Sequence, residues 1–339
     1  MTGPARAAIR DLHPAAFAFV MATGIISASA AGLGPSWLSR ALLVLASVGF
    51  VLLSAALLIR MAVYRAALAA DLRAPERVFG FFTIVAASNV LGSRLATAGH
   101  PVVTAVLAGL AAAGWLLLSY GVPVVLLARD RDSVLGAVGG AWLLWAVGTQ
   151  SLSVGASDLV PAWPSQARLL AGAAVALWSI GVVLYLLVVA LILVRWLAVP
   201  VTPAALGAPY WILMGGAAIS VLAGARILGL PDRLLVVRAT YGFVEGTSFA
   251  LWALGTWWIP LLIVLGLWRH VRKRWPLRDE PDLWSVVFPL GMYSAATFAF
   301  GAVAGLGFME PLSRVMLWVA VAAWVAVAAA FGRRVAFAS

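Results

Sequence analysis

The sequence predicts an all-α membrane protein in which ten transmembrane helices form five consecutive hairpins. The 339 residues are 64% hydrophobic and only 10% charged, with a mean hydropathy of +1.05, whereas soluble domains average about 25% charged residues. The apolar segments are long enough to cross a hydrocarbon layer of about 30 Å. They are also continuous and do not alternate apolar with polar residues, which excludes a membrane β-barrel.

Ten nearly uncharged segments follow one another in a single transmembrane domain, residues 1–339. The expected spans are 15–33, 39–61, 78–97, 101–128, 134–155, 169–194, 209–227, 246–268, 283–306 and 312–331. The N-terminal segment has the basic start and apolar middle of a signal peptide. Because nine further spans follow and the segment can itself cross a bilayer, we interpret it as the first span.

The basic residues predict the orientation of the chain. Of the 23 Lys and Arg residues, sixteen lie in the termini and in the loops after the even-numbered spans, and seven lie on the other side. By the positive-inside rule both termini are cytoplasmic, and we expect a multi-pass protein of the cell membrane. The same distribution argues against nucleic acid as the reason for the net charge of +11.

The spans fall into two alternating classes. Even-numbered spans are apolar throughout, whereas odd-numbered spans carry small and polar residues, as in "VMATGIISASAAG" and "WAVGTQSLSVGAS". A helix that is apolar all round can face lipid, but a polar face must turn inward. We therefore predict an inner ring of odd helices around a narrow axial pore and an outer ring of even helices.

The candidate pore-lining residues are the hydroxyl and amide side chains of the odd spans. They are Thr23, Ser27, Ser88, Asn89, Thr149, Gln150, Ser153, Ser220, Ser294 and Thr297. For any single residue the alternative is packing between helices, because small polar contacts are common in membrane helices. Their recurrence on all five odd spans favours a pore lining.

Helix-breaking residues occur on the same spans. Pro14 opens the first span, and Pro289 and Gly291 lie early in the ninth. Proline removes a backbone hydrogen bond and kinks a helix. We expect these positions to bend the backbone beside the pore, with tighter packing alone as the alternative.

Acidic residues are missing from the middle of every span: all twelve lie in loops or near span ends. Proton- or sodium-coupled carriers commonly place a carboxylate near mid-membrane. The sequence also lacks cysteine, paired catalytic carboxylates and metal-ligand spacing, so we expect no enzyme activity, metal or cofactor. A pore with neutral donors and a basic setting favours small anions.

Two arginines lie inside odd spans. Arg94 ends "SNVLGSR" and Arg226 ends "SVLAGAR", and the predicted topology places both toward the outer side. They can attract anions into the outer mouth. The alternative is that both extend to the membrane interface.

Four segments resemble one transporter family over nearly the whole chain. They are "HPAAFAFVMATGI" in span 1, "PYWILMGGAAISVLAG" in span 7, "LWALGTWWIPLLIVLGLWRH" in span 8 and "FPLGMYSAATFAFG" in span 9. They resemble the tellurite-resistance/C4-dicarboxylate transporter family, which is related to plant slow anion channels of the voltage-dependent anion channel superfamily, fungal malate permeases and sulfite exporters.

This resemblance implies a five-hairpin bundle with one pore per subunit, commonly in a homotrimer. It also implies that Phe288, in a Phe-Pro pair with Pro289, occludes the pore as a gate. The implied function is an anion channel or channel-like transporter. The alternative is a carrier of malate or related C4-dicarboxylates, or a tellurite or sulfite efflux transporter, with proton coupling left open. The chain lacks the long cytoplasmic tails of the plant channels, which puts kinase-gated regulation in doubt.

Overall fold

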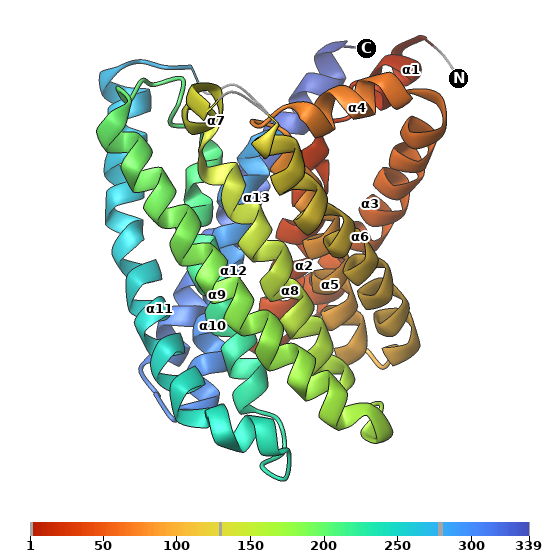
Figure 1. Cartoon of the computed structure of the whole chain (residues 1–339), viewed down its shortest axis with the longest axis vertical. Coiled ribbons are helices and arrows are strands. Elements are labelled where there is room, and N and C mark those ends of the chain that lie inside the picture. Colours follow the sequence, from red (N-terminus) through yellow and green to blue (C-terminus); the bar gives the residue numbers. More distant parts are fainter. Residues whose placement is uncertain (1–2, 129–130, 277–280, 339) are drawn as a thin grey trace.

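Five helical hairpins, one after another, make up most of the chain in a computed structural model that describes residues 3–128, 131–276 and 281–338 (Figure 1). The first helices of the five hairpins are, in chain order, α2 (Ala18–Leu33), α5 (Phe82–Thr97), α8 (Leu144–Leu159), α10 (Ile212–Leu228) and α12 (Trp284–Val303). The second helices, in the same order, are α3 (Ser36–Val63), α6 (Pro101–Leu127), α9 (Ala167–Ala198), α11 (Leu235–Leu267) and α13 (Met309–Ala338).

The first helices of the hairpins form a closed inner ring. Each packs against the next, in the order α2, α5, α8, α10 and α12, and α12 packs back against α2. The burial of the helices follows the same division: 89% of the apolar window of Val78–Thr97 is buried, against 17% for Ser36–Val63. The predicted inner and outer rings therefore describe how the helices are packed.

The outer helices present exposed apolar side chains, as lipid-facing helices should. Leu52, Leu117 and Leu197 are among the most exposed of them. Both termini lie at one end of the bundle, called here the terminal end, and α4 (Arg65–Arg73) lies across it (Figure 1). The hairpin turns lie at the opposite end, called here the hairpin end.

Each inner helix is preceded by a short 3-10 turn. The turns are η1 (Pro14–Phe17), η2 (Val78–Phe81), η3 (Gly140–Leu143), η5 (Ala208–Trp211) and η7 (Pro281–Leu283). Each turn contacts the next, and η7 contacts η1, so the turns form a second ring at the terminal end. The remaining short elements are α1 (Gly3–Arg10), α7 (Arg131–Ala137), η4 (Pro164–Gln166) and the π-helix η6 (Trp268–Arg272).

Nine helices in the described parts of the chain are long and apolar enough to cross a membrane. The predicted span 134–155 has no counterpart among them. Residues 134–137 belong to α7, and the inner helix with its 3-10 turn covers Gly140–Leu159. Its many polar residues, with Asp158 in the last turn, lower its hydropathy, yet it packs between α5 and α10 in the inner ring.

The prediction for the eighth span is wrong at its start. The helix α11 begins at Leu235, well before the expected 246. Arg238 and Glu245 suggested a loop, but Arg238 is exposed and Glu245 is half-buried, so neither charge is enclosed by the bundle and a helix can carry both.

Candidate functional site

An axial cavity of about 310 Å³ lies inside the inner ring. All five inner helices contribute to its wall. The lining residues are Ile25, Ala28, Ser29, Gly32, Asn89, Val90, Ser93, Ser151, Val154, Ile219, Leu222, Ala225, Arg226, Met292, Ala295, Phe298, Ala299 and Ala302. A water molecule takes about 30 Å³ in the liquid, so the cavity has room for several waters or for a small anion.

The cavity opens toward the hairpin end and is closed toward the terminal end. Gly32 and Ala302, near the ends of their helices, are exposed. Ile25 and Met292, one or more turns earlier in the same helices, are 3% and 0% exposed. The cavity is therefore a one-sided vestibule with a buried floor.

Phe288 lies one helical turn beyond this floor. Its side chain is 1% exposed. At 3.6 residues per turn, Met292, Ala295 and Ala299 lie within ~40° of Phe288 around the axis of α12, and all three line the cavity. The phenyl group is thus on the face of α12 that borders the axis, at the closed end of the vestibule.

The three predicted kink residues differ in what they do. Pro14 is the first residue of η1, where a missing backbone N–H costs nothing, so it begins a helix instead of bending one. Pro289 lies inside α12, which continues through it to Val303. A Cβ added to Gly291 would come within 2.9 Å of Ile25 and Ile26, so this glycine allows α12 to approach α2 closely.

Most of the predicted pore-lining hydroxyls point away from the cavity. Three threonine hydroxyls of the inner ring accept hydrogen bonds from tryptophan indoles of the outer helices. The pairs are Trp324 with Thr23 at 2.9 Å, Trp115 with Thr149 at 2.8 Å and Trp252 with Thr297 at 3.1 Å. For these threonines, packing between helices describes the structure better than a pore lining.

Serine hydroxyls in the inner ring join the two helices of their own hairpins. Ser27 donates to the Ser39 carbonyl at 2.7 Å, and the Ser39 hydroxyl donates back to the Ser27 carbonyl at 2.8 Å. In the same way, Ser153 donates to the carbonyl of Ala174, and Ser294 to that of Ser313. These serines also differ from the expectation, because their hydroxyls bond the backbone of an outer helix and are not among the cavity-lining groups.

The other predicted lining residues are divided. Asn89 lines the cavity, and its Nδ2 donates to Ser151 at 3.1 Å across two inner helices. Gln150 donates to the Trp178 carbonyl of α9, outside the ring. Ser88 and Ser220 donate to backbone carbonyls one turn earlier in their own helices.

The two intramembrane arginines occupy different places. Arg226 lines the cavity, and its side chain is 38% exposed. Arg94 is not among the cavity-lining residues: it donates to Ser39 of α3 and to Thr97 in its own last turn. Only Arg226 therefore brings a positive charge to the vestibule wall.

Two features of the vestibule were not predictable from the sequence. Ser29, Ser93 and Ser151 line it. Hydropathy cannot separate these serines from those that face outward, because it is the same for every serine. Asp158 lies 3.5 Å from Arg226, with its carboxylate only 9% exposed. Its position near a span end suggested a solvated charge, because the sequence does not reveal which neighbouring helix covers that end.

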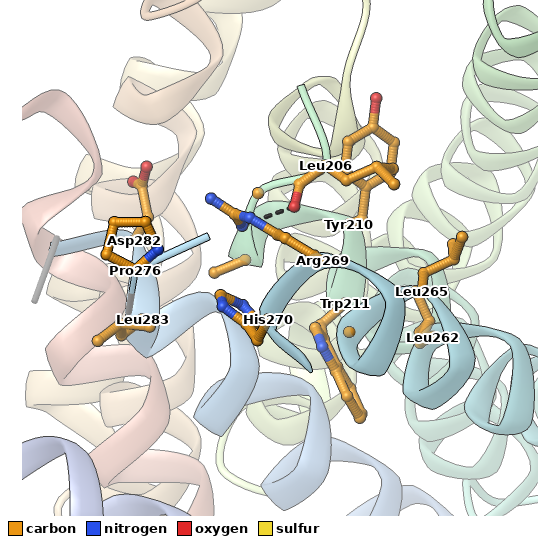
Figure 2. Close-up of a pocket in the computed structure, with 13 residues that line it drawn as sticks. Leu206, Tyr210, Trp211, Leu262, Leu265, Arg269, His270, Pro276, Asp282 and Leu283 are labelled. Carbon is orange, nitrogen blue, oxygen red and sulfur yellow. Dashed lines mark hydrogen bonds between the residues drawn. The ribbon is translucent and has the colours of Figure 1, made fainter. Parts of the chain in front are cut away.

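At the terminal end, smaller pockets lie around the ring of 3-10 turns. One of about 240 Å³ is lined by η3, η5 and by Glu76, Arg269 and Asp282. Figure 2 shows the adjoining pocket, in which Arg269 of η6, just after α11, donates to the Leu206 carbonyl at 2.6 Å. Both signs of charge meet here, so the charge at the terminal end is less uniformly positive than the basic loops suggested.

Among the described residues no group of three or more His, Asp or Glu side chains lies close enough to hold a metal ion. The chemistry available along the axis is that of hydroxyls, one amide, one arginine and an aromatic ring. Such groups can bind and guide an ion.

Comparisons with known proteins agree with this arrangement. The family model described as voltage-dependent anion channel matches residues 11–331. An uncharacterized membrane protein of Mycobacterium tuberculosis is 45% identical over 139 residues, which are 41% of this chain and 70% of the relative. An uncharacterized transporter of Methanocaldococcus jannaschii is 25% identical over 319 residues, 88% of each chain.

Proposed function

The chain belongs to the voltage-dependent anion channel family, and on that premise we propose that it conducts small anions along the axis of the inner ring, past Phe288. The family consists of membrane anion transporters and channels. The proposal adds a path and a gate: the vestibule at the hairpin end, the phenyl ring beyond its floor, and an exit through the ring of 3-10 turns.

The position of Phe288 carries the proposal. Its buried phenyl ring lies one helical turn beyond the vestibule floor, on the same face of α12 as the lining residues Met292 and Ala295, which supports a role in closing the path toward the terminal end. A hydrophobic ring in a narrow path excludes water and so blocks hydrated ions. Rotation about χ1 to another staggered rotamer would move the ring out of the path.

The wall of the vestibule supports anions as the conducted species. Arg226 supplies a positive charge, and Ser29, Ser93, Ser151 and Asn89 supply neutral polar groups. Neutral donors and one cation favour anions that shed part of their hydration, such as chloride, nitrate or sulfite. We further propose a homotrimer in the cell membrane, with the terminal end in the cytoplasm.

A carrier for C4-dicarboxylates is the second candidate, and Arg226 is the observation that favours it. A dicarboxylate needs a fixed cation in its path, and Arg226 lies in the vestibule wall. Efflux of tellurite or sulfite would use the same cation. Because Arg94 is bound to Ser39 outside the vestibule wall, a second fixed cation for the other carboxylate is missing from this wall.

Recordings from purified protein in planar bilayers, under asymmetric chloride, nitrate or malate gradients, test the proposal. We expect a current that reverses near the equilibrium potential of the permeant anion. Malate uptake into liposomes without current would favour the carrier. Folded protein that moves none of these anions by either route would refute both candidates.

A further inference from the structure

A buried carboxylate next to the vestibule has no role in the path described above. Asp158 is in the last turn of α8, and Arg226 faces it from α10. The Asp158 Oδ1 lies 3.5 Å from the Arg226 Nε, which is too long for a good charge-assisted hydrogen bond. The Ser93 hydroxyl of α5 also lies near the carboxylate.

Both members of this ion pair have unused hydrogen-bonding capacity. In the described structure, Asp158 Oδ2 and Arg226 Nε are buried atoms without a hydrogen-bond partner. A buried carboxylate is costly unless a cation and hydrogen bonds compensate it. Here the carboxylate has one cation at a loose distance, and that cation lines the vestibule.

We propose that Asp158 is a tethered competitor for the anion site on Arg226: an anion that binds there must displace the Asp158 carboxylate. This inference rests on the proposed conduction of anions through the vestibule. The ligands expected at this site are small anions with a planar carboxylate-like group, because the forked guanidinium of Arg226 matches the geometry of such a group. The carboxylate of the chain itself shows that such a group fits beside Arg226.

The competition would keep the affinity of the vestibule for anions low. An entering anion meets a negative charge within 3.5 Å of its only cation in the vestibule wall. Weak binding suits conduction, because an ion must leave the site as readily as it enters. Removing the Asp158 charge should therefore strengthen anion binding and slow the release of the anion.

Acetate is the test ligand, because it reproduces the Asp158 side chain. The measurement is the rise in Tm of the purified protein with sodium acetate concentration, from which a Kd follows. We expect acetate to bind about tenfold more tightly to Asp158→Ala and Asp158→Asn than to the wild type. The double variant D158A/R226Q should lose this gain. Chloride at equal ionic strength should give a smaller gain than acetate.

Glu310→Gln is the matched control, since Glu310 is an exposed carboxylate paired with Arg314 on α13. It should leave the acetate affinity as in the wild type. Equal affinities in the wild type and both Asp158 variants would overturn the inference, as would a gain that survives R226Q. If neither variant folds in acetate, the pair is structural and the inference also fails.

This readout is independent of transport. If the Asp158 variants bind acetate more tightly but no variant carries an anion current, the site stands and the proposed conduction fails. If currents flow with an unchanged acetate affinity, the conduction stands and the role of Asp158 fails.

Discussion

The indole of Trp324 donates to the hydroxyl of Thr23 at 2.9 Å, although 301 residues separate the two positions. The bond joins α13 of the last hairpin to α2 of the first, and so spans the point where the ring closes. Three further indole bonds run in the same sense, from the outer helix of one hairpin to the inner helix of the next: Trp115 to Thr149, Trp178 to the Ser220 carbonyl, and Trp252 to Thr297. These tryptophans hold neighbouring hairpins together, in addition to any role at the membrane interface.

Trp324→Phe should lower the stability of the bundle modestly. The change keeps an aromatic ring but removes the donor and leaves the buried Thr23 hydroxyl without its indole partner. Side-chain hydrogen bonds between membrane helices average about 0.6 kcal/mol, with a maximum near 1.7, so we expect a loss in this range. Chemical unfolding in mild detergent measures it.

A double-mutant cycle separates the bond from the loss of packing. Thr23→Val should cost a similar amount, and the double variant should cost less than the sum, because the two residues share one interaction. Trp318→Phe on the same helix is the control, since Trp318 is 49% exposed and should tolerate the change. Strict additivity of the two single variants would show that the bond contributes nothing.

The alternation of apolar and polar spans was sufficient to predict the two rings of helices. A lipid-facing helix must be apolar all round, and this requirement is visible in the sequence. The direction of each polar side chain was not predictable in the same way. A hydroxyl such as that of Thr23 or Ser153 can line a pore or bond a neighbouring helix, and the sequence pattern is the same in both cases.

The vestibule charges show a second limit of sequence reasoning. Arg226 was a candidate because a charge inside a span is rare. Asp158 was not, because burial at a span end depends on which helices pack around that end. Here α5 and α10 pack against α8 and Arg226 of α10 faces Asp158, and such long-range packing leaves no mark in the hydropathy of α8.

Gly140→Ala should destabilise the ring of 3-10 turns. An added Cβ at Gly140 would overlap the carbonyl of Pro209, where η3 and η5 meet. Because both partners are backbone, neither can rotate away, and overpacking of this kind costs roughly 1–3 kcal/mol. Gly109→Ala is the matched control: a Cβ there meets nothing within 4 Å, and alanine is the better helix former. A Tm for G140A equal to that of G109A would show that η3 and η5 are not tightly packed.

Asp71→Asn should be among the most destabilising changes at the terminal end. Asp71 accepts from Arg60 at 2.7 Å and pairs with Arg77 at 3.0 Å, and the Arg60 and Asp71 side chains are 3% and 8% exposed. Removing one partner of a buried pair leaves an uncompensated charge and costs roughly 3–5 kcal/mol. Glu310→Gln, which breaks an exposed pair, should change the unfolding midpoint far less. Similar midpoints for the two variants would mean that water reaches the Arg60–Asp71 pair.

Phe288→Ala should increase the anion current if the phenyl ring closes the axial path. The change removes the ring from the closed end of the vestibule without touching the lining residues. Phe300→Ala is the matched control, because Phe300 is equally buried on α12 but lies ~120° from Phe288 around the helix axis. Both variants lose the same volume, at about 3–5 kcal/mol each, so a shared loss of folding cannot produce a difference in current. We expect a larger chloride current only for F288A in planar bilayers; a current that stays at the wild-type level in folded F288A protein would remove Phe288 as the gate.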